Sequence, residues 1–266
     1  MPCVVKVAKD LDEQGRQHFL GEARNAIKLG PHPNIVRVFY AGDVDSTPFF
    51  VMDYDDGIDL RLLLAHQQEN NRKPLPLRIV YTILQGMADG LHYAHAGRII
   101  GGAPLGLIHR DIKPANTFIT AKGETKLLDF GISTQLDANH SGRHLFGTVR
   151  YMSPEHVQSR VCPAMDIYSL GVVAWEMLEG RPFHKGLTSN QILPLILTEN
   201  NTPPLERPDL PAEVKALIES ALSFDPSERP TAQEFSDILS SCPGYASKPK
   251  LVAERVLLAL GRLPKS

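Results

Sequence analysis

The sequence predicts an α+β fold built as two lobes, a small β-rich lobe over 1–54 and a larger helical lobe from residue 55 onward. Short runs of β-branched and aromatic residues, separated by turn residues, fill the first part, whereas apolar residues recur at helical spacing in the second. The chain has 266 residues, of which 42% are hydrophobic, enough for a sizeable core. This length fits one large domain with two lobes or two small domains, and it excludes a long array of modules.

The small lobe is expected to hold three strands and one helix. The run VVKVA predicts a strand that begins almost at residue 1, with nothing ahead of it to pair with, so its edge is expected to be unpaired. The runs IVRVFYAG and PFFVMDY predict two strands joined by a turn around 43–46. Between them and the first strand, the stretch 12–29 places apolar residues on one face of a helix, namely Phe19, Ala23, Ala26 and Ile27.

The larger lobe is expected to consist mainly of helices. A long helix is predicted by apolar residues at a spacing of four, Ile79, Ile83, Met87 and Leu91. Further helices are predicted over 168–179, 212–222 and 231–239, the last opened by a capping box of Thr231 and Glu234. The tail over 241–266 ends in the amphipathic run LVAERVLLALGRL, which either docks on the body or binds a partner. Docking is the simpler expectation.

Charge and cysteine content narrow the function classes. The 28 Lys and Arg against 30 Asp and Glu give a net charge of −2, so no field of the whole chain favours nucleic acid or an acidic membrane. The cysteines Cys3, Cys162 and Cys242 show no C-x-x-C spacing, which argues against a disulfide framework or a four-ligand zinc site. With no apolar run long enough for a leader peptide or a bilayer span, we expect a cytoplasmic protein without a membrane segment.

Two motifs indicate the chemistry. The segment 107–118 has the sequence LIHRDIKPANTF, and thirteen residues after Asn116 comes the tripeptide Asp129-Phe130-Gly131. The pair resembles the catalytic loop and the metal-binding loop of eukaryotic-type (Hanks-type) serine/threonine protein kinases. The resemblance implies the two-lobed protein-kinase fold and places the catalytic domain over 1–240, with small lobe 1–54 and large lobe 55–240. The connection between His95 and Leu107 is longer than usual, and its PLG-x-[IV]-HRD ending resembles one subgroup of bacterial kinases.

Transfer of a phosphoryl group from ATP requires Mg²⁺ on the phosphates and an acceptor hydroxyl held in line. Asp129 and Asn116 offer the hard oxygen ligands that this metal prefers. Asp111 is placed to accept the hydrogen bond of the hydroxyl and, late in the transfer, its proton. Lys113 would offset charge on the moving phosphate. The string HRDIKPAN resembles serine/threonine kinases, so the expected partners are ATP and proteins with Ser or Thr acceptors.

The resemblance also assigns nucleotide-binding residues in the small lobe. It makes Lys6 the lysine that pairs with the ATP phosphates and Glu22 its partner on the adjacent helix. It places the segment between the lobes, which would bind adenine through its backbone, at Met52, Asp53, Tyr54 and Asp55. Met52 would gate the pocket behind the adenine. The side chains expected to stack between the lobes are Val38, Ala26, His109 and Phe130.

Further positions are implied downstream. The segment GTVRYMSPE over 147–155 is similar to the end of the activation loop, with Thr148 expected against Asp111 and Lys113. Glu155 is expected to pair with a buried Arg229, and Asp166 to tie the helical lobe to the catalytic loop. Arg110 is the cation that would hold a phosphorylated loop. The candidate phosphosites are Ser133, Thr134 and Ser141.

One part of the family pattern is missing from the sequence. The family carries a G-x-G-x-x-G turn roughly 30 residues ahead of the lysine, and only residues 1–5 precede Lys6 here. Two hypotheses follow. The protein is either a Mg-ATP-dependent serine/threonine kinase or a catalytically impaired kinase-like (pseudokinase) module that works by binding partners. The retained polar residues favour the first, and the missing turn, with the weak nucleotide binding expected from it, favours the second.

Overall fold

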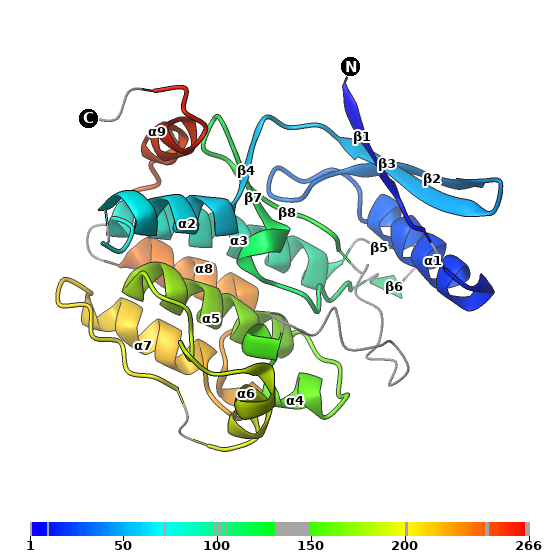
Figure 1. Ribbon diagram of the computed structural model, residues 1–266. Coiled ribbons are helices and arrows are strands. Elements are labelled where there is room, and N and C mark those ends of the chain that lie inside the picture. Colours follow the sequence, from blue (N-terminus) through cyan, green and yellow to red (C-terminus); the bar gives the residue numbers. More distant parts are fainter. Residues whose placement is uncertain are drawn as a thin grey trace.

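The chain folds into two lobes (Figure 1). The small lobe, made of strands and one helix, lies at the upper right, and the larger, mostly helical lobe lies at the left and below. The computed structural model describes residues 2–9, 11–71, 73–97, 99–100, 103–104, 106–130, 149–199, 202–242 and 245–263. None of the helices among these residues is both long and apolar enough to cross a bilayer.

The small lobe is an antiparallel sheet with strand order β1-β3-β2, packed against one helix. Its elements are β1 (Cys3–Val7), α1 (Glu13–Leu29), β2 (Val38–Val44) and β3 (Thr47–Asp53). The β2–β3 turn passes through Asp45 and Ser46, both in the left-handed region with φ of 48° and 64°, which matches the twist of a tight hairpin. Phe19 and Ala23 of α1 pack on Phe50.

The first strand is an edge strand, paired on one side only among the described residues, as expected from the sequence. Residues Cys3 to Val7 run antiparallel to β3, with Lys6 opposite Phe50. The described residues place no strand along the other edge of β1. The pairing with β3 therefore fixes which face of the sheet Lys6 occupies, because side chains alternate along a strand.

The large lobe contains the main core of the protein. Its elements are β4 (Gly57–Asp59), α2 (Leu60–Asn71), α3 (Leu77–Ala96), β5 (Ile99–Ile100), β6 (Ala103–Pro104), η1 (Pro114–Asn116), β7 (Thr117–Thr120), β8 (Thr125–Leu127), η2 (Val149–Tyr151), α4 (Pro154–Val157), α5 (Ala164–Glu179), α6 (Ser189–Ile196), α7 (Ala212–Ala221), η3 (Pro226–Glu228), α8 (Ala232–Ser241) and α9 (Pro249–Ala259). The short strands β4, β7 and β8 form a second antiparallel sheet.

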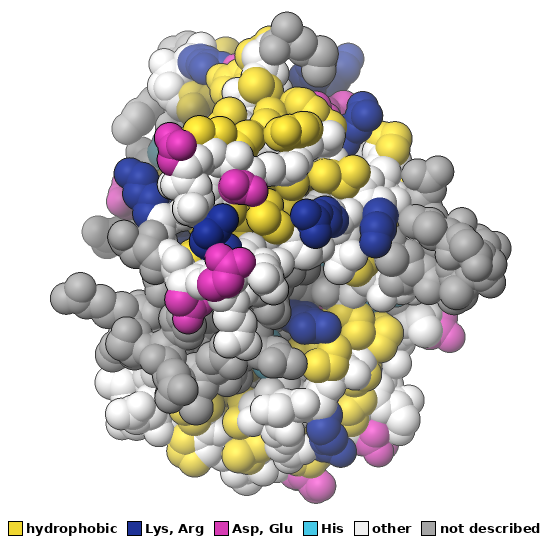
Figure 2. Space-filling view, turned by 90° about the vertical axis from the view of Figure 1, so that its right-hand side faces the viewer, with side chains coloured by type: hydrophobic (Ala, Val, Ile, Leu, Met, Phe, Trp, Pro, Cys, Tyr) yellow, Lys and Arg dark blue, Asp and Glu magenta, His cyan; other side chains and the backbone are white. Residues whose placement is uncertain are grey.

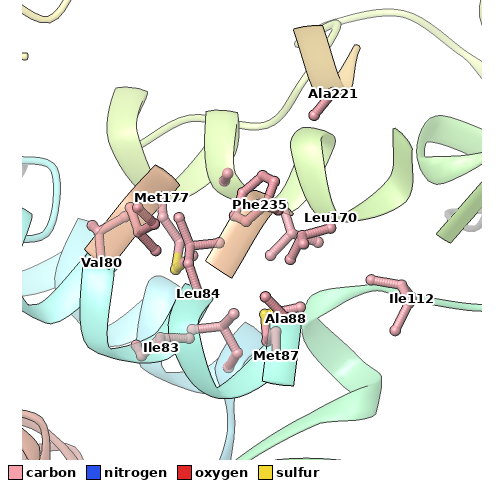
Figure 3. Packing of buried hydrophobic residues seen from close by; sticks show 14 of the residues in the cluster. Val80, Ile83, Leu84, Met87, Ala88, Ile112, Leu170, Met177, Ala221 and Phe235 are labelled. Atoms are coloured by element: carbon pink, nitrogen blue, oxygen red, sulfur yellow. The ribbon is translucent and has the colours of Figure 1, made fainter. Parts of the chain in front are cut away.

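Helix α5 lies at the centre of this core. Every residue of it from Met165 to Leu178 is buried, and α3 presents a wide apolar face to it. Figure 3 shows Leu84 and Met87 of α3 beside Met177 and Leu170 of α5, with Phe235 of α8 closing the same space. Burial of side chains of this size stabilises the fold by about 1.5–3 kcal/mol each. The large lobe is thus a rigid platform for the loops at its upper edge.

Several large hydrophobic side chains of the small lobe are exposed to solvent. It exposes large hydrophobic side chains at Val5, Val7, Phe39, Tyr40 and Val44. Figure 2 shows hydrophobic side chains gathered over the upper part of the molecule, among Lys and Arg side chains.

The tail docks on the body through α9. Val252 and Val256 are fully buried, and the backbone N–H of Lys248 donates to Thr82 Oγ1 at 2.9 Å. Beyond the helix, the guanidinium of Arg262 bonds both carboxylate oxygens of Asp56. The tail therefore contacts both the helical core and the segment that leads into β4.

Candidate active site

The loop that carries Asp111 is held in place from below by α5. The buried carboxylate of Asp166 accepts the backbone N–H of His109 at 2.7 Å and that of Arg110 at 2.8 Å. It also lies 2.8 Å from His95 Nε2. Burial alone would raise the pKa of Asp166, but the hydrogen bond and charge of His95, with those of His109, lower it below its ordinary value. An ionised Asp166 thus fixes the loop backbone just ahead of Asp111, as expected from the sequence.

Asp111 has one carboxylate oxygen that is bonded and one that has no partner among the described residues. Its Oδ2 accepts Asn116 Nδ2 at 2.7 Å and lies 2.7 Å from Lys113 Nζ. Its Oδ1 is buried and has no hydrogen-bond partner among the described residues. Arg110, just before it, holds a left-handed backbone with φ of 67°, a costly conformation for a side chain of this size. The loop therefore leaves Oδ1 of Asp111 with unused acceptor capacity among the described residues.

Asn116 and Asp129 lie on adjacent segments. The backbone carbonyl of Asn116 accepts the N–H of Leu128 at 2.9 Å, which places the residue after Leu128 beside it. The amide nitrogen of Asn116 is spent on the backbone and side chain of Asp111, so its Oδ1 is left as an acceptor. These two residues offer oxygen ligands of the kind that Mg²⁺ prefers.

The donor set fits a metal that is shared with a phosphate. The described residues contain no group of three His, Cys, Asp or Glu side chains arranged around a common metal position. Mg²⁺ usually takes only one or two protein carboxylates and fills its octahedron with phosphate oxygens and water. Asp129 and Asn116 meet that requirement.

Lys6 reaches this site across the gap between the lobes. Its Nζ lies 2.5 Å from Oδ2 of Asp129 and 5.7 Å from the ring centroid of Phe50. The sequence predicted Glu22 as its partner. The backbone of Glu22 lies in α1, but its side chain is outside the described residues. The ion pair with Asp129 joins residues 123 positions apart in the chain, and no local pattern in the sequence indicates it.

The segment between the lobes differs in detail from the expectation. Met52 and Asp53 end β3, and the backbone N–H of Asp53 donates to the carbonyl of Arg37 at 3.0 Å. The N–H of Asp53 is therefore bonded within the protein and is not available to adenine. Tyr54 is 52% exposed, and the carboxylate of Asp55 pairs with Lys126 Nζ at 2.7 Å. The side chain of Asp55 thus anchors the segment to β8.

Aromatic contacts lie directly under the site. The rings of His109 and Phe130 are 4.6 Å apart between centroids, and His109 Nε2 lies 2.7 Å from the carbonyl of Leu128. Val38 and Ala26, the other two side chains of the predicted stack, belong to the core of the small lobe. The predicted stack is therefore divided between the cores of the two lobes.

The predicted ion pair of Glu155 and Arg229 is confirmed. Arg229 Nη1 lies 2.6 Å from Oε1 and Nη2 lies 3.0 Å from Oε2, and both side chains are buried. The carbonyls of Ser223, Phe224 and Ala164 accept the remaining guanidinium N–H groups. The pair therefore has the satisfied geometry that a buried charge requires. The residues Gly131, Ser133, Thr134, Ser141 and Thr148 lie outside the described residues.

Comparison with known proteins places the chain in a family. The protein kinase domain family matches residues 2–238. The chain is 37% identical over 230 residues to the tyrosine-protein kinase MasK of Myxococcus xanthus, covering 84% of this chain and 35% of that protein. It is 32% identical over 249 residues to the serine/threonine-protein kinase PknB of Mycolicibacterium smegmatis, covering 89% of this chain and 38% of that protein. The chain thus spans about a third of the length of these curated relatives.

A solved protein kinase domain is similar in fold to this chain. The crystal structure of the Mycobacterium tuberculosis PknI kinase domain superimposes with a TM-score of 0.66 at 28% sequence identity, covering 90% of this chain and 84% of that one.

Proposed function

Because the chain belongs to the protein kinase domain family, we propose that it transfers the γ-phosphoryl group of ATP to serine and threonine hydroxyls of proteins. The observation that carries the proposal is the state of Asp111. One carboxylate oxygen is held by Lys113 and Asn116, and the other is buried without a partner among the described residues. A carboxylate fixed in this way is suited to receive one hydrogen bond from an acceptor hydroxyl.

The reaction is written with Asp111 as the proton acceptor. The hydroxyl oxygen forms a bond to the γ-phosphorus while the bond to the bridging oxygen of the leaving ADP breaks, and the hydroxyl proton passes to Asp111 late in the transfer. Lys113, 2.7 Å from Asp111 Oδ2, adds positive charge beside the moving phosphoryl group. Asn116 and Asp129 would hold Mg²⁺, which supplies charge neutralisation on the phosphates.

Lys6 contributes a second cation from the small lobe. In the structure its ammonium neutralises Asp129. We propose that it also contacts the ATP phosphates, because the Asp129 carboxylate that it bonds is the proposed metal ligand. Met52, Asp53, Tyr54 and Asp55 would border the adenine, with the catalytic domain spanning 1–240.

The acceptor class rests on Lys113 within HRDIKPAN, which is typical of serine/threonine kinases, and on relatives such as PknB that are named as such. MasK, named a tyrosine kinase, makes this a point to test directly. Phosphoamino-acid analysis of the labelled product is expected to give phosphoserine and phosphothreonine. Phosphotyrosine as the main product would contradict the acceptor class.

The decisive experiment measures phosphate transfer with Asp111→Asn. With Mg²⁺ and labelled ATP, we expect phosphorylation of a general protein substrate or of the chain itself. The variant should lose about 100-fold to 10,000-fold in rate. Asp237→Asn, at an exposed position on α8, is the matched control and should retain full activity. Equal rates for Asp111→Asn and wild type would refute the role of Asp111, and no transfer with no ATP binding would favour the partner-binding module.

A further inference from the structure

A cavity of about 540 Å³ opens beside the catalytic loop and is lined by residues of the large lobe. One wall is the inner side of α2 with the segment that follows it, and the opposite wall is the C-terminal end of α5 with the residues after it. Lys113, Pro114 and Ala115 of the catalytic loop complete the lining. Because Lys113 is bonded to Asp111, the cavity begins one side chain away from the proposed position of the acceptor hydroxyl.

The walls of the cavity are held together by the protein. Gln68 Nε2 of α2 donates to the carbonyl of Gly180, just beyond α5, at 2.8 Å. Arg207 Nη1 donates to the carbonyl of Leu75 at 2.7 Å, behind the same wall. The shape of the cavity is therefore preorganised, which reduces the entropic cost of binding a ligand in it.

The charge that this cavity presents to solvent is positive. The cations in its lining are Arg61, Lys73, Lys113, Arg150 and Arg181. Among the described residues that line it, Glu176 is the one acid. The side chain of Arg61 is 66% exposed and that of Arg181 is 38% exposed. The side chain of Glu176 is only 7% exposed.

Glu176 is buried, and both of its carboxylate oxygens already accept hydrogen bonds. Its Oε1 accepts the backbone N–H of Phe183 at 2.8 Å, and its Oε2 accepts the hydroxyl of Tyr151 at 2.8 Å. Burial raises the pKa of Glu176 by more than these donors and Arg150 lower it. Glu176 is thus a poor partner for a basic side chain that enters the cavity.

Three of these cations, Arg61, Lys73 and Arg150, retain unused capacity, whereas Lys113 is bonded to Asp111 and Arg181 pairs with Glu179 and Glu206. Nε of Arg150 is buried and has no hydrogen-bond partner among the described residues, and its Nη1 approaches Glu176 only to 4.0 Å. Lys73 forms no ion pair within the described part of the chain, and Arg61 has only the exposed contact to Asp59 at 3.3 Å. Exposed contacts of this kind are weak and exchange readily with a better anionic partner.

We propose that this cavity selects protein substrates with an aspartate or glutamate side chain near the acceptor Ser or Thr, and so makes the enzyme specific for acidic segments. The assignment rests on the proposed kinase activity. The substrate carboxylate enters between α2 and the end of α5, where Arg61 and Lys73 attract it and Arg150 offers the unpartnered N–H at depth. Because these contacts form in the ground state as well as in the transition state, they lower KM rather than raise kcat.

The test compares peptides that share one Ser acceptor and differ only in the flanking charge. One carries Asp and Glu, a second carries Asn and Gln at the same positions, and a third carries Lys and Arg. We expect kcat/KM to fall from the first to the second by about tenfold, and further to the third, with each exposed charge contact giving up to about fivefold. High salt should reduce the difference because it screens exposed charges.

Variants then assign the preference to the cavity. Arg61→Gln with Lys73→Gln should raise KM for the acidic peptide with little change in kcat, and should leave KM for the neutral peptide as it is. Arg78→Gln with Lys215→Gln removes the same charge from exposed positions outside the cavity and is expected to change neither value. Arg61→Glu with Lys73→Glu should shift the preference toward the basic peptide.

The outcomes separate this inference from the proposed function. If all peptides are phosphorylated with equal kcat/KM, the enzyme is a kinase but the cavity does not select charge, and the inference is wrong. If the acidic preference persists unchanged in Arg61→Gln with Lys73→Gln, it arises elsewhere and the inference is also wrong. If no peptide and no protein is phosphorylated, the proposed function itself fails.

Discussion

The guanidinium of Arg229 bonds both carboxylate oxygens of Glu155, although the two residues are 74 positions apart and both are buried. The pair joins the start of α4, which follows the described end of the loop beside the site, to the segment between η3 and α8. Removal of either partner leaves one charge buried without compensation. The pair therefore anchors α4 together with the packing of Val157 in a small apolar cluster.

The first prediction concerns the stability that this pair provides. Arg229→Ala should lower the free energy of unfolding by about 3–5 kcal/mol, measured by urea denaturation. Lys215→Ala is the control, because Lys215 and Glu219 form an exposed pair at 3.9 Å on α7 that is worth about 0.3–0.5 kcal/mol. Equal effects of the two substitutions would show that Glu155 and Arg229 are not a buried pair in solution.

The second prediction concerns the support of the catalytic loop. Asp166→Asn retains one acceptor oxygen but turns an amide toward the N–H groups of His109 and Arg110, so one of them loses its acceptor. We expect a loss of about 1–3 kcal/mol in unfolding free energy, together with a lower kcat, since a misplacement of about 1 Å can cost roughly 100-fold. Asp89→Ala, which removes the acceptor of the bonds from Gln85 Nε2 and Ser236 Oγ, should destabilise without lowering kcat. A normal kcat in Asp166→Asn would contradict the positioning role.

The third prediction tests the docking of the tail. Gly123 and Gly186 both hold a left-handed backbone, with φ of 84° and 88°, so alanine at either position costs roughly 1–2 kcal/mol. Only at Gly123 would the added Cβ collide with α9, since it would stand 1.9 Å from the carbonyl oxygen of Pro249. Gly123→Ala should therefore destabilise the protein more than Gly186→Ala and expose the tail to limited proteolysis. Identical stability and cleavage in both variants would argue against the docked tail.

The fourth prediction is a pH dependence of stability. Burial is the largest cause that lowers the pKa of His32, His156 and His184 below the ordinary value of 6.5. The folded protein therefore binds fewer protons on these groups than the unfolded chain does just below pH 6.5. Stability is present above this pH and is lost as the pH falls toward the lowered pKa values, with a slope of up to about 1.4 kcal/mol per pH unit for each group.

This dependence can be assigned to one residue by denaturation at pH 7.5 and pH 5.5. Wild type should lose stability between the two, and His156→Gln should lose less. His92→Gln, at an exposed position of α3, should follow wild type. A wild-type stability that rises on acidification would give the opposite sign and refute the prediction.

Periodicity and cap residues were enough to predict the longer helices. The structure begins α1 at Glu13 with Asp12 as its N-cap, and α8 carries the predicted capping box of Thr231 and Glu234. The helix predicted from residue 168 begins earlier, at Ala164, because α5 is buried all round and has no polar face to mark its start.

Other elements carried too little local signal. Helix α2 was not predicted, although Leu60, Leu63 and Leu64 stand at the helical spacing of three and four residues. The extra leucine at 62, which is 49% exposed, lies off that face and obscures the period. The strands β4, β7 and β8 span only three or four residues, and their pairing is set by contacts distant in the chain.

In the candidate site, too, some features follow from a local motif and others from contacts between distant segments. Asp111, Lys113 and Asn116 lie within one short loop, so a local motif was sufficient to predict them together. The contact of Lys6 with Asp129 depends on how the lobes meet, and the cationic cavity combines α2, the catalytic loop and the end of α5. Contacts between distant segments of this kind cannot be read from spacing along the chain.

The backbone bond from Asp53 to Arg37 has a mechanical consequence. It joins the residue just before β2 to the last residue of β3, so the two segments that border the large lobe lie side by side. The N–H of Val36 donates to the carbonyl of Leu127, and the N–H of Ala121 donates to the carbonyl of Asp56. Both segments are therefore bonded to residues within or next to the small sheet β4-β7-β8. We expect any rotation of the sheet β1-β3-β2 relative to the large lobe to pivot at these two bonded segments. Such a rotation would displace the distant β2–β3 turn most, and the ion pair of Lys6 with Asp129 would oppose it because the pair joins the two lobes.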